Sequence, residues 1–241
     1  MADVHGRVAA PRRWRLFAGS TAAFVLALGA LAAFVRWHGA PPALANSAVG
    51  APFVDLFNAV RERAYFTVDD DCLDALTAAG VDFTFVAEPP RRDPCPLRNV
   101  VRVLPTRLLR RPLYMTCRLA HALDRFDRQV LEPAAQRHFG QPVAHLIENG
   151  VRSCRPVEGY RALLSEHAFA NAIDIEGFVL RDGTAIVVAR EPARSGSAAD
   201  FLREVTAQAC DVFRTVLGPG FDDQHRAHVH LDMGLLGGCR P

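Results

Sequence analysis

The sequence predicts an α+β fold, with an antiparallel sheet core and flanking helices, preceded by one N-terminal transmembrane helix. Three observations predict this class. Residues 16–35 contain no charged side chain. After them, helical patterns come first, and strand patterns with one helix among them come later. Half of the 241 residues are hydrophobic and 22% are charged, which is a globular composition rather than a disordered one.

The uncharged run at 16–35 matches the length of about 20 residues that a helix needs to cross a bilayer. More positive charge precedes the run than follows it, which favours a cytoplasmic N-terminus. The flanking arginines are Arg12, Arg13 and Arg15 before the run and Arg36 after it. The alternative is a cleaved signal peptide that ends at Ala43-Leu44-Ala45.

The order of segments follows from this anchor. We expect a cytoplasmic N-terminus at residues 1–15 and the anchor at 16–35. A linker rich in alanine and proline follows at 36–50, and one exported folded domain at 51–241. The membrane is therefore one expected partner, through the N-terminal helix. The formal net charge of +2 gives no electrostatic reason to expect nucleic acid as another.

Export makes the cysteines informative, because oxidising compartments favour disulfides. All six cysteines follow the apolar run, and their number is even. Pairing neighbours in chain order predicts Cys72–Cys95, Cys117–Cys154 and Cys210–Cys239. Free buried thiols are the alternative. No two cysteines have the spacing of a zinc knuckle.

Helical spacing of apolar residues predicts three helices. They cover residues 53–66, 114–138, which Pro133 could kink, and 199–217, which Gly218 ends. A fourth, short helix is predicted between Asp69-Asp70-Asp71, whose carboxylates suit a helix N-terminus, and Gly80.

Strands are predicted where apolar and polar residues alternate or where short apolar runs occur. These segments are 81–86, 100–104, 143–147, 172–180, 184–189 and 228–232. The segments 172–180 and 184–189 flank Arg181-Asp182-Gly183, a sequence that is typical of a hairpin turn. Residues 88–96 form a proline-rich loop, and Asn149-Gly150 marks a turn.

Three histidines crowd together near the C-terminus. On a strand, His228 and His230 share one face about 6.6 Å apart, at about 3.3 Å rise per residue. Asp232 joins them on that face, and His225 lies just upstream. Imidazoles in this pattern suit a metal such as zinc. The alternative is a surface cluster of histidines without a ligand.

A second pair of candidate ligands lies upstream. On one helix, His167 and Asp174 would be about 10.5 Å apart, too far to share an ion comfortably. The apolar alternation instead places Asp174 in a strand and His167 on the loop before it. Two histidines and one carboxylate would leave a fourth position for water, as catalytic zinc requires. The alternative is an N-cap Ser165 with a satisfied core histidine.

These segments together resemble a known family. They are Ser153-Cys154-Arg155-Pro156, Leu164 to His167, Asn171 to Asp174, Val216 to Gly220 and His225 to Asp232. The chain resembles the extensin-like protein C-terminal domain family of bacteria over about Cys72 to Cys239. That family in turn resembles the zinc peptidases of the D-Ala-D-Ala metallopeptidase, lysostaphin and hedgehog group, which are called LAS metallopeptidases.

The resemblance implies a role for each candidate residue. His167, Asp174 and His230 would hold Zn²⁺, and His228 would lie beside the ion and aid catalysis. His225 is a second candidate for proton transfer, since histidine titrates near neutral pH. Arg155 and Ser165 match positions that bind the substrate peptide. The alternative for Arg155 is a surface ion pair with Glu158 or Glu166.

Two positions depart from the family pattern. Ala170 replaces a usual glycine, which is tolerable unless the backbone there needs a positive φ. Ala227 replaces the glutamate that serves carboxypeptidase relatives as general base. The resemblance still implies a zinc peptidase that acts on peptidoglycan peptides. The uncharged run and its flanking arginines add a single span in the bacterial inner membrane, with the domain in the periplasm. The alternatives are a wall-binding domain without turnover and a disulfide-stabilised structural domain without metal.

Overall fold

The computed structural model describes residues 41–88, 95, 97–190 and 195–241. The predicted transmembrane helix at 16–35 lies outside these residues. Within the described ranges, no helix combines the length and the apolar character that crossing a membrane requires. The chain divides into two units, residues 1–44 and 45–241. The one-turn helix α2 (Pro42–Ala45) lies at the boundary, and every later element belongs to the second unit.

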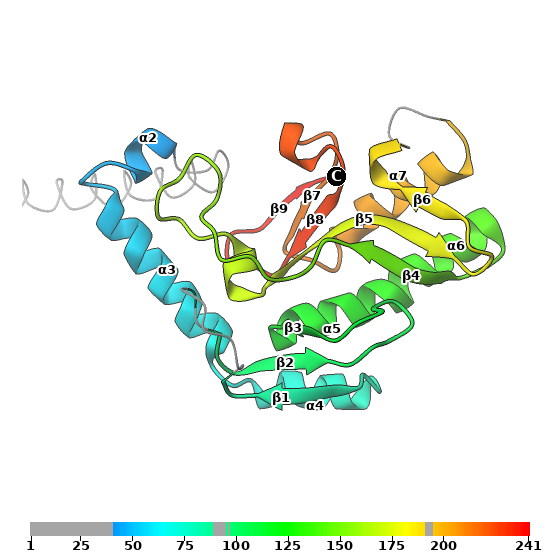
Figure 1. Ribbon diagram of the computed structural model, residues 1–241, viewed down its shortest axis with the longest axis horizontal. Coiled ribbons are helices and arrows are strands. Elements are labelled where there is room, and N and C mark those ends of the chain that lie inside the picture. Colours follow the sequence, from blue (N-terminus) through cyan, green and yellow to red (C-terminus); the bar gives the residue numbers. More distant parts are fainter. Residues whose placement is uncertain (1–40, 89–94, 96, 191–194) are drawn as a thin grey trace, which may run out of the picture. The chain divides into compact units, whose positions relative to one another are not determined.

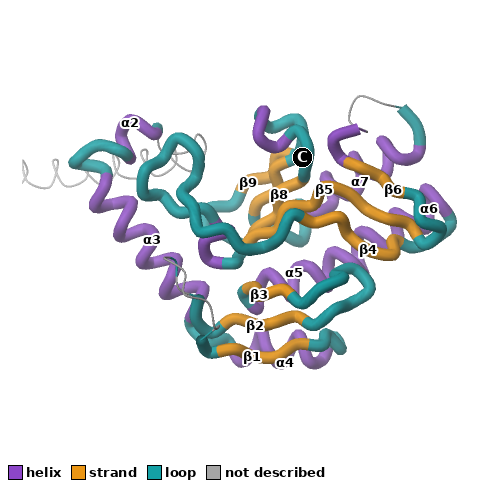
Figure 2. The backbone as a smooth tube through the Cα atoms, viewed as in Figure 1, coloured by secondary structure: helices purple, strands orange, loops and turns teal. Residues whose placement is uncertain are grey.

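The second unit contains two sheets, which confirms the mixed α+β class with antiparallel strands (Figures 1 and 2). The smaller sheet is antiparallel and has the order β1 (Phe83–Val86), β2 (Val100–Val103), β3 (Leu113–Met115). The larger sheet has the order β4 (Val143–Glu148), β5 (Ala172–Leu180), β8 (Val229–Asp232), β7 (Thr215–Leu217), β9 (Gly238–Arg240). Strand β6 (Ala185–Val187) forms the predicted hairpin with β5. Only the β7–β9 pair is parallel among the described strands.

The helices of the second unit are α3 (Ala51–Phe66), α4 (Asp70–Ala78), α5 (Cys117–Phe126), the π-helical turn η1 (Asp127–Leu131), α6 (Glu132–Phe139) and α7 (Ser197–Ala209). Short 3-10 turns occur at η2 (Glu166–Phe169), η3 (Val188–Arg190) and η4 (Asp223–His225). Asp69 is the N-cap of α4, as predicted, and its carboxylate accepts a hydrogen bond from the Cys72 N–H. Thr116 caps α5 in the same way.

Two predicted helices were too long. Residues 113–115 form β3 rather than the first turn of a helix, so the helix begins at Cys117. It then runs through η1 into α6, and Pro133 lies in the first turn of α6, where its missing N–H costs least. The helix predicted at 199–217 ends at Ala209, and residues 215–217 form β7. The buried Val212, Phe213 and Val216 continue the apolar spacing, so periodicity alone could not locate this end.

One continuous apolar core joins both sheets to α4, α5, α6 and α7. On β5, Ile173 and Ile175 are fully buried in this core, whereas Asp174 between them is only partly buried. On β8, Val229 and Leu231 are in the core in the same way. Because side chains alternate along a strand, His230 and Asp174 lie on the opposite face of the sheet.

Three disulfides are present, as expected from the even number of cysteines. Two of the three predicted pairings were wrong: Cys72 pairs with Cys117, and Cys95 pairs with Cys154, in place of Cys72–Cys95 and Cys117–Cys154. The prediction of Cys210–Cys239 is confirmed. The first bond joins α4 to α5, and the third joins the end of α7 to β9.

Candidate metal centre

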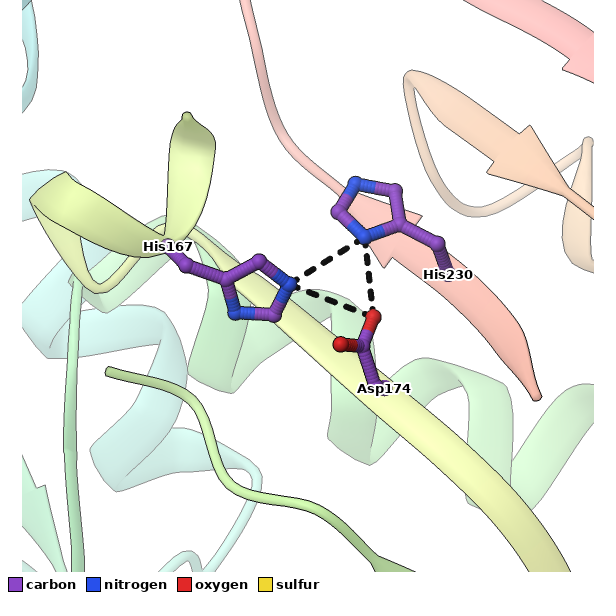
Figure 3. A group of neighbouring side chains, drawn as sticks. All are labelled: His167, Asp174 and His230. Carbon is purple, nitrogen blue, oxygen red and sulfur yellow. Dashed lines mark hydrogen bonds and ion pairs between the residues drawn. The ribbon is translucent and has the colours of Figure 1, made fainter. Parts of the chain in front are cut away.

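Strand pairing brings two of the predicted ligands together. Strand β5 pairs antiparallel with β8, and in this register Asp174 lies directly opposite His230. The third residue, His167, comes from the turn η2 just before β5. The three residues that the family resemblance implies as ligands therefore lie together (Figure 3).

The three side chains are within contact distance of one another. His230 Nδ1 is 2.9 Å from Asp174 Oδ1, and His167 Nε2 is 3.2 Å from each of these two atoms. Two ligand atoms at a tetrahedral zinc ion are about 3.4 Å apart when each bond is about 2.1 Å. Side chains spaced in this way could hold a metal ion.

A tight turn places His167 beside the strand. Ser165 caps η2 through its hydroxyl, which accepts from the His167 N–H at 3.3 Å. Ala170 ends the turn in the left-handed region, at φ 53° and ψ 37°. The backbone here therefore does need a positive φ, at a cost of about 1–2 kcal/mol for a residue other than glycine. Burial of the Ala170 methyl group, which is fully enclosed, offsets part of that cost.

Hydrogen bonds orient both imidazoles. His167 Nδ1 lies 3.0 Å from the Val151 carbonyl oxygen, so that nitrogen carries the proton and Nε2 offers its lone pair to the site. His230 Nε2 lies 3.0 Å from Asp232 Oδ2, so in the neutral ring Nε2 carries the proton and Nδ1, which is 2.9 Å from Asp174 Oδ1, has the lone pair. A metal-binding histidine characteristically donates its other N–H to a carbonyl or carboxylate in this way.

The charges around the site favour a cation. Among the described residues, the carboxylates of Glu166, Asp174 and Asp232 accompany only one buried arginine, Arg61. Two negative charges therefore remain when the histidines are neutral, and a divalent ion would balance them. Burial by itself raises the pKa of Asp174, but in the metal-free protein its contacts with His167 and His230 outweigh burial and hold that pKa well below its usual range. Burial and the nearby charge of Asp232 raise the pKa of Glu166.

The pKa of His230 gives a testable pH dependence. In the metal-free protein, burial lowers this pKa, but hydrogen bonds to Asp174 and Asp232 outweigh burial and raise it from 6.5 to about 9. A folded-state pKa above the unfolded value means that protonation stabilises the fold. This contribution, on the order of 3 kcal/mol, is complete below pH 6.5 and is lost as pH rises through about 9.

Urea unfolding in the presence of a chelator should therefore show a free energy of unfolding that falls between pH 6.5 and 9. The His230→Gln protein is the matched control, because it cannot gain the proton and should lack this fall. Equal pH profiles for the two proteins would show that His230 is not protonated in the folded state.

Two more histidines line the site. His228 Nε2 is 3.6 Å from Asp174 Oδ1, and burial lowers the His228 pKa. The His225 ring centroid is 5.2 Å from that of His228 and 5.9 Å from that of His230. Asp222 fixes His225 through a 2.6 Å contact between Oδ1 and Nδ1. Both histidines predicted to aid proton transfer thus lie beside the three candidate ligands.

A backbone hydrogen bond joins the two predicted substrate-binding residues, Arg155 and Ser165. The Ser165 N–H donates to the Arg155 carbonyl oxygen at 3.0 Å. The Arg155 side chain is exposed, whereas Ser165 is buried and its hydroxyl caps η2. The suggested ion pair between Arg155 and Glu166 does not form, because Glu166 binds Arg61.

Buried side chains that the sequence did not predict surround Glu166. Arg61 and Tyr65, on α3, both contact its carboxylate. These residues are about a hundred positions away in the chain, and α3 had been predicted only from its apolar spacing. A possible signal was the presence of an arginine and a tyrosine four residues apart, on one face of that helix.

The fold and site define a class: an α+β domain with a histidine-rich candidate metal centre on the face of the larger sheet opposite the core. The chain belongs to the extensin-like protein C-terminus family, whose model matches residues 70–240. Searches of curated proteins and of solved structures found no match to this chain.

Proposed function

We propose that this protein is a zinc-dependent hydrolase that acts on peptidoglycan peptides, with a site like that of the LAS metallopeptidases. The observation that carries the proposal is the convergence of His167, Asp174 and His230, whose candidate ligand atoms all lie within 4.8 Å of one another. Two nitrogen ligands and one oxygen ligand suit zinc better than magnesium or calcium, which prefer oxygen alone. A three-ligand set also leaves a position open for chemistry.

The residues beside the ligands have distinct roles in this proposal. The chemistry that zinc supplies when bound is polarisation of a carbonyl group and activation of water near pH 7. His228 is neutral near that pH because burial lowers its pKa, so its imidazole can accept a proton. Asp222 orients His225, whose ring centroid lies 5.2 Å from that of His228. The exposed guanidinium of Arg155 can bind a peptide carboxylate.

A second candidate function is a wall-binding domain that retains the site without turnover. The observation that favours it is Ala227, at the position where carboxypeptidase relatives are expected to have a glutamate base. In the hydrolase proposal, His228 replaces that base. The two functions therefore differ in turnover and not in metal binding.

Cleavage of muropeptides separates these functions. The full-length protein, purified without chelator, is expected to carry about one zinc per chain and to release peptide fragments that mass spectrometry identifies. The His167→Ala protein is the matched control without a complete ligand set. Zinc with muropeptide binding but no cleavage would favour the wall-binding function. A protein that takes up no zinc would contradict both.

The proposal includes a single membrane anchor at 16–35 and a periplasmic domain. The charge difference across the apolar run supports this orientation, and the three disulfides fit an oxidising compartment. A reporter that is active only in the periplasm, fused after Pro241, should be active. Activity of a reporter that works only in the cytoplasm, fused at the same position, would instead show that the domain lies in the cytoplasm.

A further inference from the structure

Helix α3 carries a buried arginine that reaches the turn holding His167. Arg61 is only 3% exposed. Its guanidinium donates to Glu166 Oε1 at 2.9 Å and to the Leu164 carbonyl oxygen at 2.7 Å. The rings of Phe57 and Phe169 lie on it at 4.8 and 4.7 Å from its Cζ atom. Arg61 Nε is buried without a hydrogen-bond partner among the described residues. Burying a charge is costly unless an opposite charge is near, and the Glu166 carboxylate supplies that charge, so Arg61 fixes the position of Glu166.

Glu166 transmits this contact to the first histidine of the site. It directly precedes His167 and accepts hydrogen bonds from Arg61, from the Tyr65 hydroxyl at 3.1 Å and from Asn171 Nδ2 at 2.9 Å. Asn171 is fully buried, and its side-chain oxygen accepts from the Thr116 hydroxyl at 2.7 Å. The turn that carries His167 is thus held at both of its ends.

The same group of side chains also reaches the second histidine. A Cβ atom on Gly234 would lie 2.9 Å from both Asp232 Oδ1 and Glu166 Oε1, so only glycine lets the two carboxylates approach one backbone segment. The Gly234 N–H donates to Asp232 Oδ1 at 2.7 Å, and the next N–H, of Leu235, donates to the Tyr65 hydroxyl at 3.0 Å. Asp232 in turn contacts His230 Nε2.

We infer that Arg61 and Tyr65 are positioning residues of the metal centre, acting through Glu166 on His167 and through the Gly234-Leu235 backbone on Asp232 and His230. Helix α3 lies before residues 70–240, which the family model matches. It is nevertheless part of the site by this inference, which rests on the proposed function because it needs a bound ion. A helix that merely packed against the domain would affect stability and leave the ion's surroundings unchanged.

The test measures metal binding by the full-length protein in two ways, a zinc titration against a competing chelator and the visible absorption spectrum of bound Co²⁺. Arg61→Met keeps the packing between Phe57 and Phe169 but removes the paired charge. It is expected to weaken zinc binding by about 10- to 100-fold, as loss of an outer partner typically does, and to change the Co²⁺ spectrum. The matched control is Arg63→Met, an exposed arginine on the same helix, which should change neither.

Further variants keep the test decisive if Arg61→Met does not fold. The double variant Arg61→Met with Glu166→Gln removes both charges, so no unpaired charge stays buried. Tyr65→Phe removes only the hydroxyl and should weaken zinc binding by about 5-fold, the worth of one hydrogen bond. The inference is overturned if wild-type protein binds zinc and the folded variants bind it equally tightly with an unchanged Co²⁺ spectrum. Absence of zinc from the wild-type protein would instead overturn the proposed function, and the inference with it.

Discussion

Replacing His230 by alanine is expected to weaken zinc binding by about 100-fold or more, because a three-ligand site loses a donor atom and its tetrahedral geometry together. His230 is held through both of its ring nitrogens. It lies opposite Asp174 in the strand register, and its second nitrogen contacts Asp232. A competition titration with a chelator of known affinity measures the change.

The neighbouring histidine provides the control for that experiment. His228 lies 3.6 Å from Asp174 but outside the three-residue group, so His228→Ala should leave zinc affinity within a few-fold of the wild-type value. Zinc retained by His230→Ala and lost by His228→Ala would show that the two histidines have been assigned the wrong way round.

His228→Ala is expected instead to abolish most turnover. If His228 accepts the proton during hydrolysis, removing its imidazole should lower kcat by about 10²- to 10⁴-fold while zinc stays bound. The measurement is the rate of muropeptide cleavage at saturating substrate, with zinc content determined on the same samples. His225→Ala is the comparison, since that ring contacts the His228 ring and is held by Asp222.

A larger loss of kcat in His225→Ala than in His228→Ala would exchange the roles of the two residues. Unchanged turnover in both variants would exclude histidine as the base that replaces the glutamate expected at Ala227. Either outcome would leave the metal assignment intact, because the ligand set is tested separately by zinc affinity.

Much of the site could be predicted from the sequence because it depends on local rules. Apolar alternation placed Asp174 and His230 in strands, and both do lie in strands, on the face opposite the core. The choice of His230 over His228 as the ligand came from the family resemblance, since spacing treats both histidines alike. The left-handed turn at Ala170 could be suspected only because a glycine was expected there.

The disulfide pairing could not be predicted in this way. The bonds Cys72–Cys117 and Cys95–Cys154 close loops with sequence separations of 45 and 59 residues. Doubling a loop costs only about 0.6 kcal/mol of closure entropy, so chain order gives almost no preference among the possible pairs. Packing decides instead: α4 lies against α5, which brings Cys72 and Cys117 together.

The contribution of α3 was equally inaccessible to sequence reasoning. The bond between Arg61 and Glu166 joins residues separated by 105 positions, and no periodic pattern reports such a contact. An arginine inside an apolar helix pattern predicts a solvated side chain by default. Burial of Arg61 is therefore a property of the tertiary structure, and it becomes visible only when α3 packs on the turn η2.

The most direct test of the metal assignment is anomalous diffraction at the zinc absorption edge from crystals of the purified protein. The expected result is one anomalous peak at about 2.0–2.2 Å from His167 Nε2, an Asp174 carboxylate oxygen and His230 Nδ1, with His228 near the ion but not bonded to it. A peak bonded to His228 in place of His230, or crystals soaked in zinc that show no peak between these residues, would contradict the assignment.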